Sequence, residues 1–274
     1  MMVRDALRAA TEQLIDSDTA RLDAELLMAH TLGVSRDTLL MQHLDGHIPV
    51  GFDALLQRRI THEPLAYITG TRDFWTITLG VAPGVLIPRP DSETLIEAAV
   101  AHFGATGPTR VLDLGTGSGA LLLAALHHWP KATGLGIDAS EAALEIARKN
   151  AAAIAPGRAI MRIGDWATGI AERFDLILCN PPYVETDASL SPDVLREPHA
   201  ALFSGADGLD DYRRIIPQLA ARIAPHGLIA MEIGYRQASA VQMLFAEQNM
   251  ATSSVKDLGG RDRAILHFAL GKHA

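Results

Sequence analysis

VLDLGTGSGA, at residues 111–120, is the most informative segment of this 274-residue chain. An apolar run leads into Gly115, and Gly117 and Gly119 follow before a second apolar run begins. Glycines at such a turn let the chain bend sharply and let a ligand approach the backbone. Because open α/β sheets bind ligands at the carboxyl ends of their strands, the segment predicts the first strand, turn and helix of a ligand-binding domain.

Strand and helix patterns alternate beyond this segment. The expected strands are Arg110–Leu114, Thr133–Ile137, Ala159–Ile163, Phe174–Cys179 and Gly227–Ile233. The expected helices are Ser118–His128, Ser140–Ala153, Gly208–Ile223 and Tyr235–Asn249. Short apolar strands separated by amphipathic helices predict a parallel sheet with helices on both faces. The chain then breaks the alternation, since Thr252–Asp257 and Ala264–Ala269 predict a terminal antiparallel pair around a GGRD turn.

The first 70 residues have a different pattern, with apolar residues at helical spacing. These residues are Val3, Leu7, Leu14 and Ile15, then Leu22, Leu26, Leu27 and Ala29, and later Leu55, Leu56 and Ile60. Gly33 is expected to end the second helix. Residues 1–70 contain six Arg, no Lys and ten Asp or Glu, a surplus of four negative charges. Such a surface suits a basic protein partner better than a nucleic acid.

Between the helical segment and the α/β pattern lies RDFWTITLGVAPGVLI, residues 72–87. Its β-branched and aromatic residues, with Gly and Pro at turn positions, predict a β-hairpin. A helix is expected to follow, with Asp91 as its N-cap. We therefore expect three parts, namely a helical domain at 1–70, a hairpin linker at 71–90 and an α/β domain at 91–274.

A nucleoside site is expected around the glycine turn, Gly115–Gly119. Asp138 ends the second expected strand, where a carboxylate can accept hydrogen bonds from both ribose hydroxyls. Helix capping is the alternative role for Asp138, although Ser140 is better placed for it. The glycine spacing alone also satisfies a dinucleotide pattern. Asp113 distinguishes a dinucleotide from S-adenosylmethionine as the ligand. An acid beside the turn repels a pyrophosphate and favours a ligand with a cationic amino acid portion, as in S-adenosylmethionine.

Trp166 follows the third expected strand and offers an aromatic face to an adenine ring. Its alternative role is to close an edge of the core. Together with the turn and Asp138, it completes the features expected of a nucleoside pocket.

The reaction site is expected in DLILCNPPYV, residues 175–184. A planar NH2 group is a poor nucleophile because its lone pair is delocalised. Its two hydrogens can be held by two acceptors, the side-chain oxygen of Asn180 and the carbonyl of Pro181. Pro181 and Pro182 stiffen the loop, since proline fixes φ and lacks an N–H, and Tyr183 offers a flat wall. No strong general base is needed, because the nitrogen becomes acidic as it gains the methyl group.

These residues resemble the amino-methylating S-adenosylmethionine-dependent methyltransferases, whose signature is [DNS]-P-P-[YFW]. More closely, the chain resembles the release factor glutamine methyltransferase family along nearly its whole length. The segments that carry this resemblance are EPLAYITGTRDFW (63–75), GVLIPRPDSE (84–93), DLGTGSG (113–119), NPPYV (180–184), EPHAALFSGADGL (197–209) and DLGGRDR (257–263). Arg89 belongs to this pattern without an assigned role.

The resemblance implies a Rossmann-like class I methyltransferase sheet with terminal antiparallel strands, preceded by a small substrate-recognition domain and a connecting β-hairpin. It implies methyl transfer from S-adenosylmethionine, with S-adenosylhomocysteine as product, to the side-chain amide of the glutamine in the Gly-Gly-Gln motif of peptide chain release factors. The implied cofactor-binding residues are Gly115, Thr116, Gly117, Ser118, Gly119, Asp138, Trp166 and Asn180. Asn180 and Pro181 are the implied catalytic residues, and Asn180, Pro181, Pro182 and Tyr183 hold the glutamine.

Composition limits the alternatives. The formal net charge is −8, which disfavours the main rival, an adenine-N6 DNA or RNA methyltransferase, because nucleic-acid binding usually needs a basic patch. A nicotinamide-dependent dehydrogenase would share only the glycine spacing, and a non-catalytic binding protein would not need residues 180–183. The single cysteine, Cys179, is expected to be packed in the core.

No apolar stretch reaches about 18 residues and the first residues lack a signal-peptide pattern. We therefore expect a cytoplasmic enzyme without a membrane span. No metal site is expected either, since the histidines are scattered and form no ligand pattern.

Overall fold

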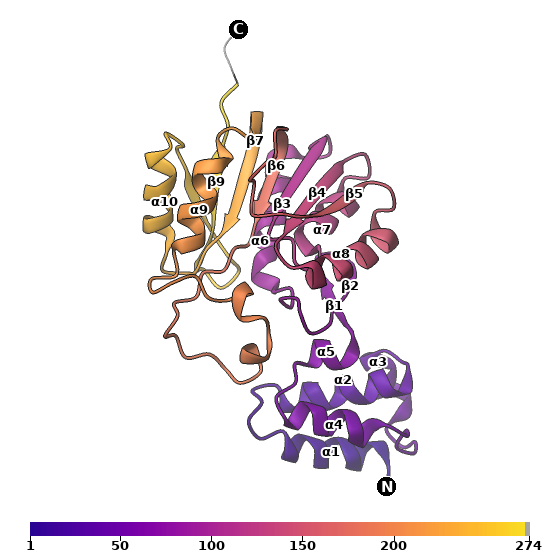
Figure 1. Ribbon diagram of the computed structural model, residues 1–274. Coiled ribbons are helices and arrows are strands. Elements are labelled where there is room, and N and C mark those ends of the chain that lie inside the picture. Colours follow the sequence, from indigo (N-terminus) through magenta and orange to yellow (C-terminus); the bar gives the residue numbers. More distant parts are fainter. Residues whose placement is uncertain (272–274) are drawn as a thin grey trace. The chain divides into compact units, whose positions relative to one another are not determined.

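A seven-stranded sheet forms the centre of the α/β part of the computed structural model, which describes residues 1–271 (Figure 1). The strand order is β5-β4-β3-β6-β7-β9-β8. β9 runs antiparallel to both of its neighbours, and the other pairs are parallel. The strands are β3 Arg110–Leu114, β4 Thr133–Asp138, β5 Ala159–Ile163, β6 Phe174–Cys179, β7 Ile223–Glu232, β8 Ser253–Lys256 and β9 Asp262–Phe268. The predicted Rossmann-like sheet with a terminal antiparallel pair is confirmed.

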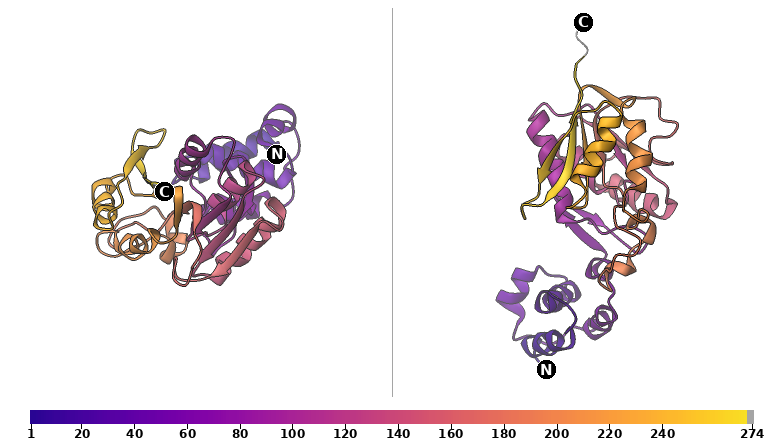
Figure 2. Two further views of the ribbon diagram at one scale, coloured as in Figure 1. Left: turned by 90° about the horizontal axis from the view of Figure 1, so that it is seen from above. Right: turned by 90° about the vertical axis from the view of Figure 1, so that its left-hand side faces the viewer.

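Helices cover both faces of the sheet, because successive strand residues point to opposite faces and both sets are apolar. Val111 and Leu176 pack in one core, whereas Leu112 and Ile177 pack in the other. The first core contains residues of α6 Glu93–Phe103, α7 Ala120–His128 and α8 Glu141–Ile154; the second contains residues of α9 Asp210–Leu219 and α10 Ala238–Glu247. The right-hand view of Figure 2 shows α6 and α9 on opposite sides of the strands.

Local signals explain several helix ends. Ser140 caps α8, and its Oγ accepts a hydrogen bond from the Ala143 N–H at 3.2 Å. Two expectations were wrong. Asp91 does not cap a helix but lies in the short 3₁₀ turn η2, Pro90–Ser92, and its carboxylate pairs with Arg263 at 2.9 Å. The helix expected at 208–223 ends at Leu219, and Ile223 already belongs to β7.

The connecting hairpin is shorter than residues 72–87. Its strands are β1 Thr71–Phe74 and β2 Ile77–Gly80, so residues 81–87 form a loop. Asn150 of α8 holds the end of β2, accepting from the Gly80 N–H at 2.8 Å and donating to the Gly80 carbonyl at 2.9 Å. The same side-chain amide donates to the Ser118 carbonyl at 2.9 Å, which connects the hairpin to the glycine turn.

The chain divides into two compact units. The first contains Met1–Thr71 and Leu190–Arg196, and the second contains Arg72–Ser189 and the chain from Glu197 onward. The first unit is helical, as expected, with α1 Val3–Gln13, α2 Ala20–Leu32, α3 Arg36–Thr38, the π-helix η1 Leu39–His43, α4 Phe52–Ile60, α5 Leu65–Thr69 and the 3₁₀ turn η3 Val194–Arg196. Gly33 ends α2 with a left-handed φ of 68°. A buried ion pair, Arg59–Asp23 at 2.8 Å, lies within this unit.

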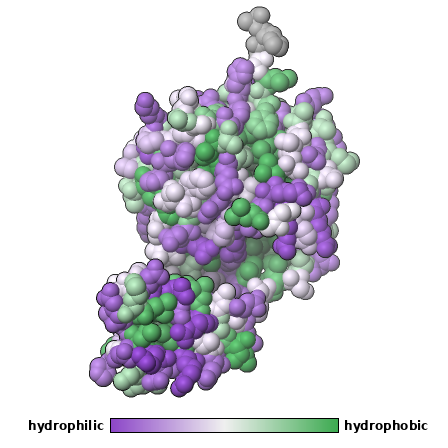
Figure 3. Space-filling view, turned by 180° about the vertical axis from the view of Figure 1, so that it is seen from behind, coloured by the Kyte–Doolittle hydropathy of each residue, from purple (hydrophilic) through white to green (hydrophobic). Residues whose placement is uncertain are grey.

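On the face of the second unit that Figure 3 shows, polar and apolar residues are interspersed. None of the helices in the described range, 1–271, combines the length and apolar character that a membrane crossing requires. Over that same range, no three side chains of His, Cys, Asp or Glu gather as a metal ion would need.

Candidate active site

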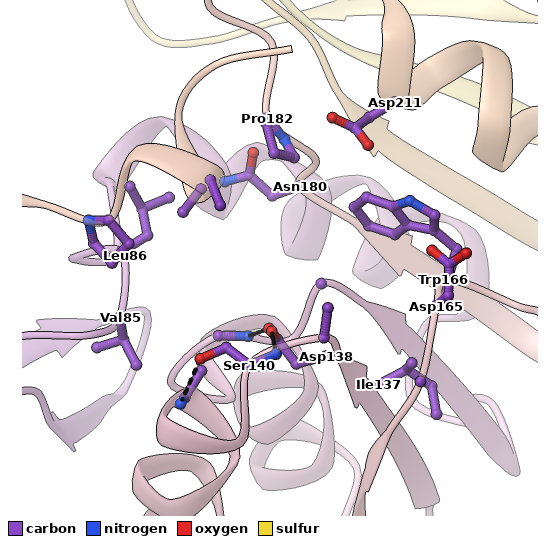
Figure 4. Close-up of a pocket in the computed structure, with 18 of the residues that line it drawn as sticks. Val85, Leu86, Ile137, Asp138, Ser140, Asp165, Trp166, Asn180, Pro182 and Asp211 are labelled. Atoms are coloured by element: carbon purple, nitrogen blue, oxygen red, sulfur yellow. Dashed lines mark hydrogen bonds between the residues drawn. The ribbon is translucent and has the colours of Figure 1, made fainter.

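A cavity of about 430 Å³ lies at the carboxyl ends of β3, β4, β5 and β6 (Figure 4). Its volume is typical of small-molecule sites, which span roughly 300–1,000 Å³. The sequence-predicted residues in its wall are Gly115, Gly117, Asp138, Trp166, Asn180 and Pro182. In the view of Figure 4, Asn180 and Pro182 lie on one side of the cavity and Asp138 lies across from them. The structure therefore brings the nucleoside and reaction segments together.

A second, smaller cavity of about 50 Å³ shares Gly115, Gly117, Leu86 and Asn180 with the larger one. Thr116 and Ser118 line this smaller cavity. Three further sequence-predicted residues line neither of the two cavities; they are Gly119, Pro181 and Tyr183.

The glycine turn has the backbone conformation that its sequence demands. Gly115, Gly117 and Gly119 all have positive φ, at 71°, 55° and 87°. The N–H groups of Gly115 and Thr116 both donate to the Ile137 carbonyl at 2.9 Å, so the end of β4 fixes the start of the turn. These hydrogen bonds tie the first two residues of the turn to the end of β4.

Asp138 is held by two backbone groups. One carboxylate oxygen accepts from the Gly117 N–H at 2.8 Å and the other from the Ser140 N–H at 2.9 Å. Each oxygen keeps further lone pairs for a ligand in the cavity. The carboxylate thus connects the glycine turn to the start of α8 and presents hydrogen-bond acceptors in fixed positions.

Trp166 lies against the glycine turn. A Cβ built on Gly115 would be 3.1 Å from Cζ3 of the indole, a tight contact that would press on the ring, and the positive φ of Gly115 disfavours a side chain there as well. The backbone of Trp166 is itself left-handed, with φ 50°, a conformation that is uncommon for large residues and clusters at functional sites. The position of the Trp166 ring is therefore linked to the conformation of the glycine turn at Gly115.

Asp113 is a buried acid at the end of β3 and lines the smaller cavity. Its Oδ2 accepts from the Thr116 hydroxyl at 2.6 Å and the Leu122 N–H at 3.3 Å. Its Oδ1 has no hydrogen-bond partner in the described part of the chain. Burial raises the pKa of Asp113 to about 7, against the opposing effect of the Thr116 hydrogen bond. An unpaired buried acceptor of this kind suits a cationic group.

Asn180 directly follows β6, and its side-chain amide has a defined orientation. Its Nδ2 donates to the Ser92 hydroxyl at 3.2 Å. Because the amide NH2 has this partner, Oδ1 is the atom left to accept hydrogen bonds from a ligand. The residue therefore presents an acceptor, as its predicted role requires.

The loop after Asn180 is braced from two sides. Gln237 donates to the Tyr183 carbonyl at 3.0 Å, and the Tyr183 hydroxyl donates to Glu232 at 3.3 Å. The following residue, Val184, exchanges backbone hydrogen bonds of 2.9 Å with Leu202 and Ser204. These contacts hold residues 180–183 in place and bring the segment around residue 200 next to them.

Several cavity residues were not predicted from the sequence. They are Val85, Leu86, Pro198, Ala200, Ala201, Asp211 and Arg214. Arg214 pairs with Asp165 at 2.6 Å and with Asp211 at 3.1 Å. Arg89, which had no assigned role, pairs with the buried Glu197, whose other oxygen accepts from the Ile87 N–H at 2.8 Å. This pair connects the loop after the hairpin to the segment around residue 200.

Cys179 is fully buried, and burial raises the pKa of its thiol well above the usual value. It belongs to the core cluster on the α9 and α10 face. A buried thiol of this kind is inert as a nucleophile.

Comparison with known proteins gives two family matches. Residues 5–70 match the model described as "PrmC N-terminal domain", and residues 91–206 match "Methyltransferase small domain". A release factor glutamine methyltransferase of Rhodospirillum rubrum is 43% identical over 254 residues, covering 90% of this chain and 78% of the relative. The protein of that name from Caulobacter vibrioides is 40% identical over 272 residues, covering 95% of this chain and 94% of the relative.

Solved structures share the fold at lower identity. The catalytic domain of hMettl16, in complex with the MAT2A 3′UTR hairpin 6, aligns with a TM-score of 0.57 at 15% identity, covering 90% of this chain and 94% of that one. A ribosomal protein L11 methylase from Lactobacillus delbrueckii subsp. bulgaricus aligns with a TM-score of 0.51 at 21% identity, covering 69% and 84%. These similarities support the methyltransferase fold.

Proposed function

This chain belongs to the release factor glutamine methyltransferase family, and on that premise we propose that it methylates the side-chain amide nitrogen of the glutamine in the Gly-Gly-Gln motif of peptide chain release factors. The observation that carries the proposal is the orientation of Asn180. Its amide oxygen remains available in the same cavity that Gly117 and Asp138 line. The methyl acceptor and the methyl donor can therefore meet at one place.

S-adenosylmethionine is the proposed methyl donor; when bound, it supplies an electrophilic methyl group on a cationic sulfur and is converted to S-adenosylhomocysteine. The residues present fit it. Asp138 would accept from the ribose hydroxyls, Trp166 would stack on the adenine, and the glycine turn 115–119 would face the remainder. The unpaired Oδ1 of buried Asp113 would meet the cationic amino group. This last acceptor is the feature that a nicotinamide dinucleotide would not use.

The residues after β6 would bind and orient the glutamine amide. The Asn180 Oδ1 and the Pro181 carbonyl would accept its two hydrogens, and Pro182 and Tyr183 would limit its movement. Each such hydrogen bond contributes only about 0.5–1.5 kcal/mol to net stability. Fixed orientation contributes more, up to roughly 7–11 kcal/mol of a reaction barrier in ideal cases. We therefore assign positioning, rather than base catalysis, as the main contribution of this loop.

The remaining parts of the chain have proposed roles as well. We assign residues 1–70 to substrate recognition, residues 71–90 to the linker and residues 91–274 to methyl transfer. The surplus of four negative charges on residues 1–70 would attract a basic surface on the release factor. The charge of residues 1–70 does not support the adenine-N6 alternative, because a nucleic-acid substrate carries negative phosphates that an acidic surface repels.

The test of this function is methyl transfer with purified components. Radiolabelled S-adenosylmethionine and this protein should label purified release factor, and mass spectrometry should locate one methyl group on the Gly-Gly-Gln glutamine. A release factor with alanine in place of that glutamine is the control and should remain unlabelled. Labelling of DNA or RNA, with none on the release factor, would instead establish the adenine-N6 alternative.

Loss of the ribose acceptor should weaken donor binding. Asp138→Ala is expected to reduce S-adenosylmethionine affinity by about 1–3 kcal/mol, as hydrogen bonds to the ribose disappear. Titration calorimetry would measure the change. Asp165→Ala, which alters a neighbouring acid that is paired with Arg214, serves as a comparison and should have a smaller effect. An unaltered dissociation constant for Asp138→Ala would limit that residue to bracing the turn.

Donor binding should depend on pH through Asp113. Its pKa is raised to about 7 by burial, so the carboxyl is largely protonated at pH 6 and ionised at pH 8. A cationic ligand favours the ionised form and lowers that pKa, so binding should release a proton and tighten as pH rises. The expected gain is about fivefold between pH 6 and pH 7, below the range near pH 8 in which the amino group of the donor loses its own proton. Calorimetry in buffers of different ionisation enthalpy would detect the proton, and Asp113→Asn should abolish both effects.

A further inference from the structure

Two irregular segments form part of the wall of the larger cavity. The first, residues 81–89, follows β2, and the second, residues 197–202, contains only the 3₁₀ turn η4 His199–Ala201. The residues of these segments that line the cavity are Gly84, Val85 and Leu86, then Pro198, Ala200 and Ala201. In the view of Figure 4, Val85 and Leu86 lie on the opposite side of the cavity from Trp166. A ligand that stacks on the indole would lie between the ring and the first segment.

A buried carboxylate joins the two segments. Glu197 comes directly before the cavity residue Pro198, and its side chain is 2% exposed. Its Oε2 accepts from the Ile87 N–H at 2.8 Å, and its Oε1 accepts from the Arg89 guanidinium. Ile87 comes directly after the cavity residue Leu86. Both carboxylate oxygens are thus paired with the first segment, next to the residues that line the cavity.

Each segment is also attached to a different part of the α/β domain. Arg72 of β1 donates to the Pro88 carbonyl at 3.2 Å, which attaches the first segment to the hairpin. The Val184 N–H donates to the Leu202 carbonyl at 2.9 Å, which attaches the second segment to the loop after β6. Glu197 therefore connects the part of the wall that the hairpin holds to the part that the loop after β6 holds.

A charged link suits segments that have little regular structure. Such segments move more than helices and strands do unless contacts hold them. Two of the three cavity residues of the second segment are alanines, and small side chains make few packing contacts. Hydrogen bonds to a carboxylate are stronger than neutral ones and are directional. The bonds of Glu197 can therefore fix how the two segments lie against each other.

We propose that Glu197, acting through Arg89 and the Ile87 N–H, is a positioning residue that holds the two segments together as one wall and so retains S-adenosylmethionine in the cavity. Arg89 thereby gains the role that its sequence context did not assign. Neither side chain of the ion pair lines the cavity, so the pair acts on the lifetime of the bound donor. The identity of the ligand rests on the proposed function, whereas the link between the segments is a property of the protein alone.

The first experiment follows S-adenosylmethionine dissociation by stopped-flow tryptophan fluorescence in Glu197→Gln, Arg89→Met and the double variant. Glutamine breaks the link because its NH2 would face one of the two donors. The dissociation rate constant should rise about tenfold in each single variant, while the association rate constant stays within about threefold, since most changes in affinity appear in dissociation. Because both residues act through one ion pair, the double variant should dissociate little faster than either single variant. Wild-type dissociation in either single variant, or multiplied increases in the double variant, would overturn the proposal.

Asp257→Asn is the matched control for the loss of a buried acid. Its carboxylate likewise accepts from a backbone N–H, that of Arg261 at 3.1 Å, and from an arginine side chain, that of Arg263 at 3.1 Å. Its side chain is 6% exposed, and it lines neither cavity of the site. This variant should lose thermal stability, as Glu197→Gln should, and keep the wild-type dissociation rate. Equal acceleration in both variants would assign the effect to general destabilisation and refute the positioning role.

A second measurement needs no ligand and so separates this proposal from the proposed function. Hydrogen–deuterium exchange of the free protein is followed by mass spectrometry. Peptides that cover residues 81–89 and 197–202 should exchange at least about tenfold faster in Glu197→Gln and Arg89→Met than in the wild type. Unchanged exchange in these peptides would refute the link itself. If the wild-type protein did not bind S-adenosylmethionine, the proposed function would fail, and the exchange result would still decide whether Glu197 holds the segments together.

Discussion

Replacing Asn180 by alanine is expected to lower the turnover number by about a hundredfold or more, in line with the loss of one preorganised hydrogen-bond partner in other enzymes. The variant removes the Oδ1 acceptor that remains after Nδ2 has donated to Ser92. The Pro181 carbonyl would then hold only one hydrogen of the glutamine amide, and the nitrogen could rotate away from the methyl donor. Single-turnover kinetics with saturating donor and release factor would measure the step directly.

Two controls distinguish a loss of orientation from a loss of structure. Donor affinity and thermal unfolding should change little in Asn180→Ala, because the glycine turn, Asp138 and Trp166 are held by other contacts. Ser92→Ala should have a smaller effect on turnover, since it loosens the Asn180 amide but leaves its oxygen in the protein. A fully active Asn180→Ala enzyme would mean that this side chain does not orient the methyl acceptor.

The regular parts of the fold were predictable because their signals are local. Ala159–Ile163 and Phe174–Cys179 were expected as strands and have those bounds. Each is a short run rich in apolar residues with turn residues beyond, although β5 is an edge strand of which only Met161 is buried, whereas β6 is apolar on both faces. The glycine turn was equally clear, since three positive φ values in five residues require glycine.

Boundaries failed where a tertiary contact overrode a local signal. Asp91 has the side chain of an N-cap, yet its carboxylate is paired with Arg263, which lies 172 residues later in the chain. The helix expected at 208–223 ends early because residues from Ile223 onward pair with β6 instead. Neither partner can be inferred from the residues around these positions.

Part of the site was predictable because some of its residues lie next to strands that the sequence indicates locally. Asp138 ends β4 and Asn180 directly follows β6, and the carboxyl ends of neighbouring parallel strands meet at one sheet edge. Asp211 and Arg214 lie on a helix surface, and Glu232 ends a strand whose pattern is simply apolar. Only the packing of α9 and β7 beside the loop at 180–183 gives these three residues their position, so no spacing rule could have selected them.

Gly115→Val is expected to weaken S-adenosylmethionine binding by about a hundredfold or more, since it would displace the Trp166 ring proposed to stack on the adenine, a contact worth about 1–3 kcal/mol, and would distort the turn proposed to face the donor. Gly115 has a φ of 71°, which a β-branched residue strongly resists. Its new Cβ would also lie 3.1 Å from the Trp166 ring. Titration calorimetry would measure the affinity, and thermal unfolding would measure the accompanying loss of stability.

Gly260 provides the matched control for this prediction. It has a φ of 77° and no atom within 4 Å of a built Cβ, so Gly260→Val carries similar backbone strain without the steric clash. It should lose stability and retain donor affinity. Adding Trp166→Ala to Gly115→Val should recover part of the lost stability, because the colliding ring is gone, but should not restore binding. The same addition to Gly260→Val should recover no stability, since residue 260 does not touch that ring. If the two glycine variants bound the donor equally well, the contact between the turn and the indole would have no part in forming the site.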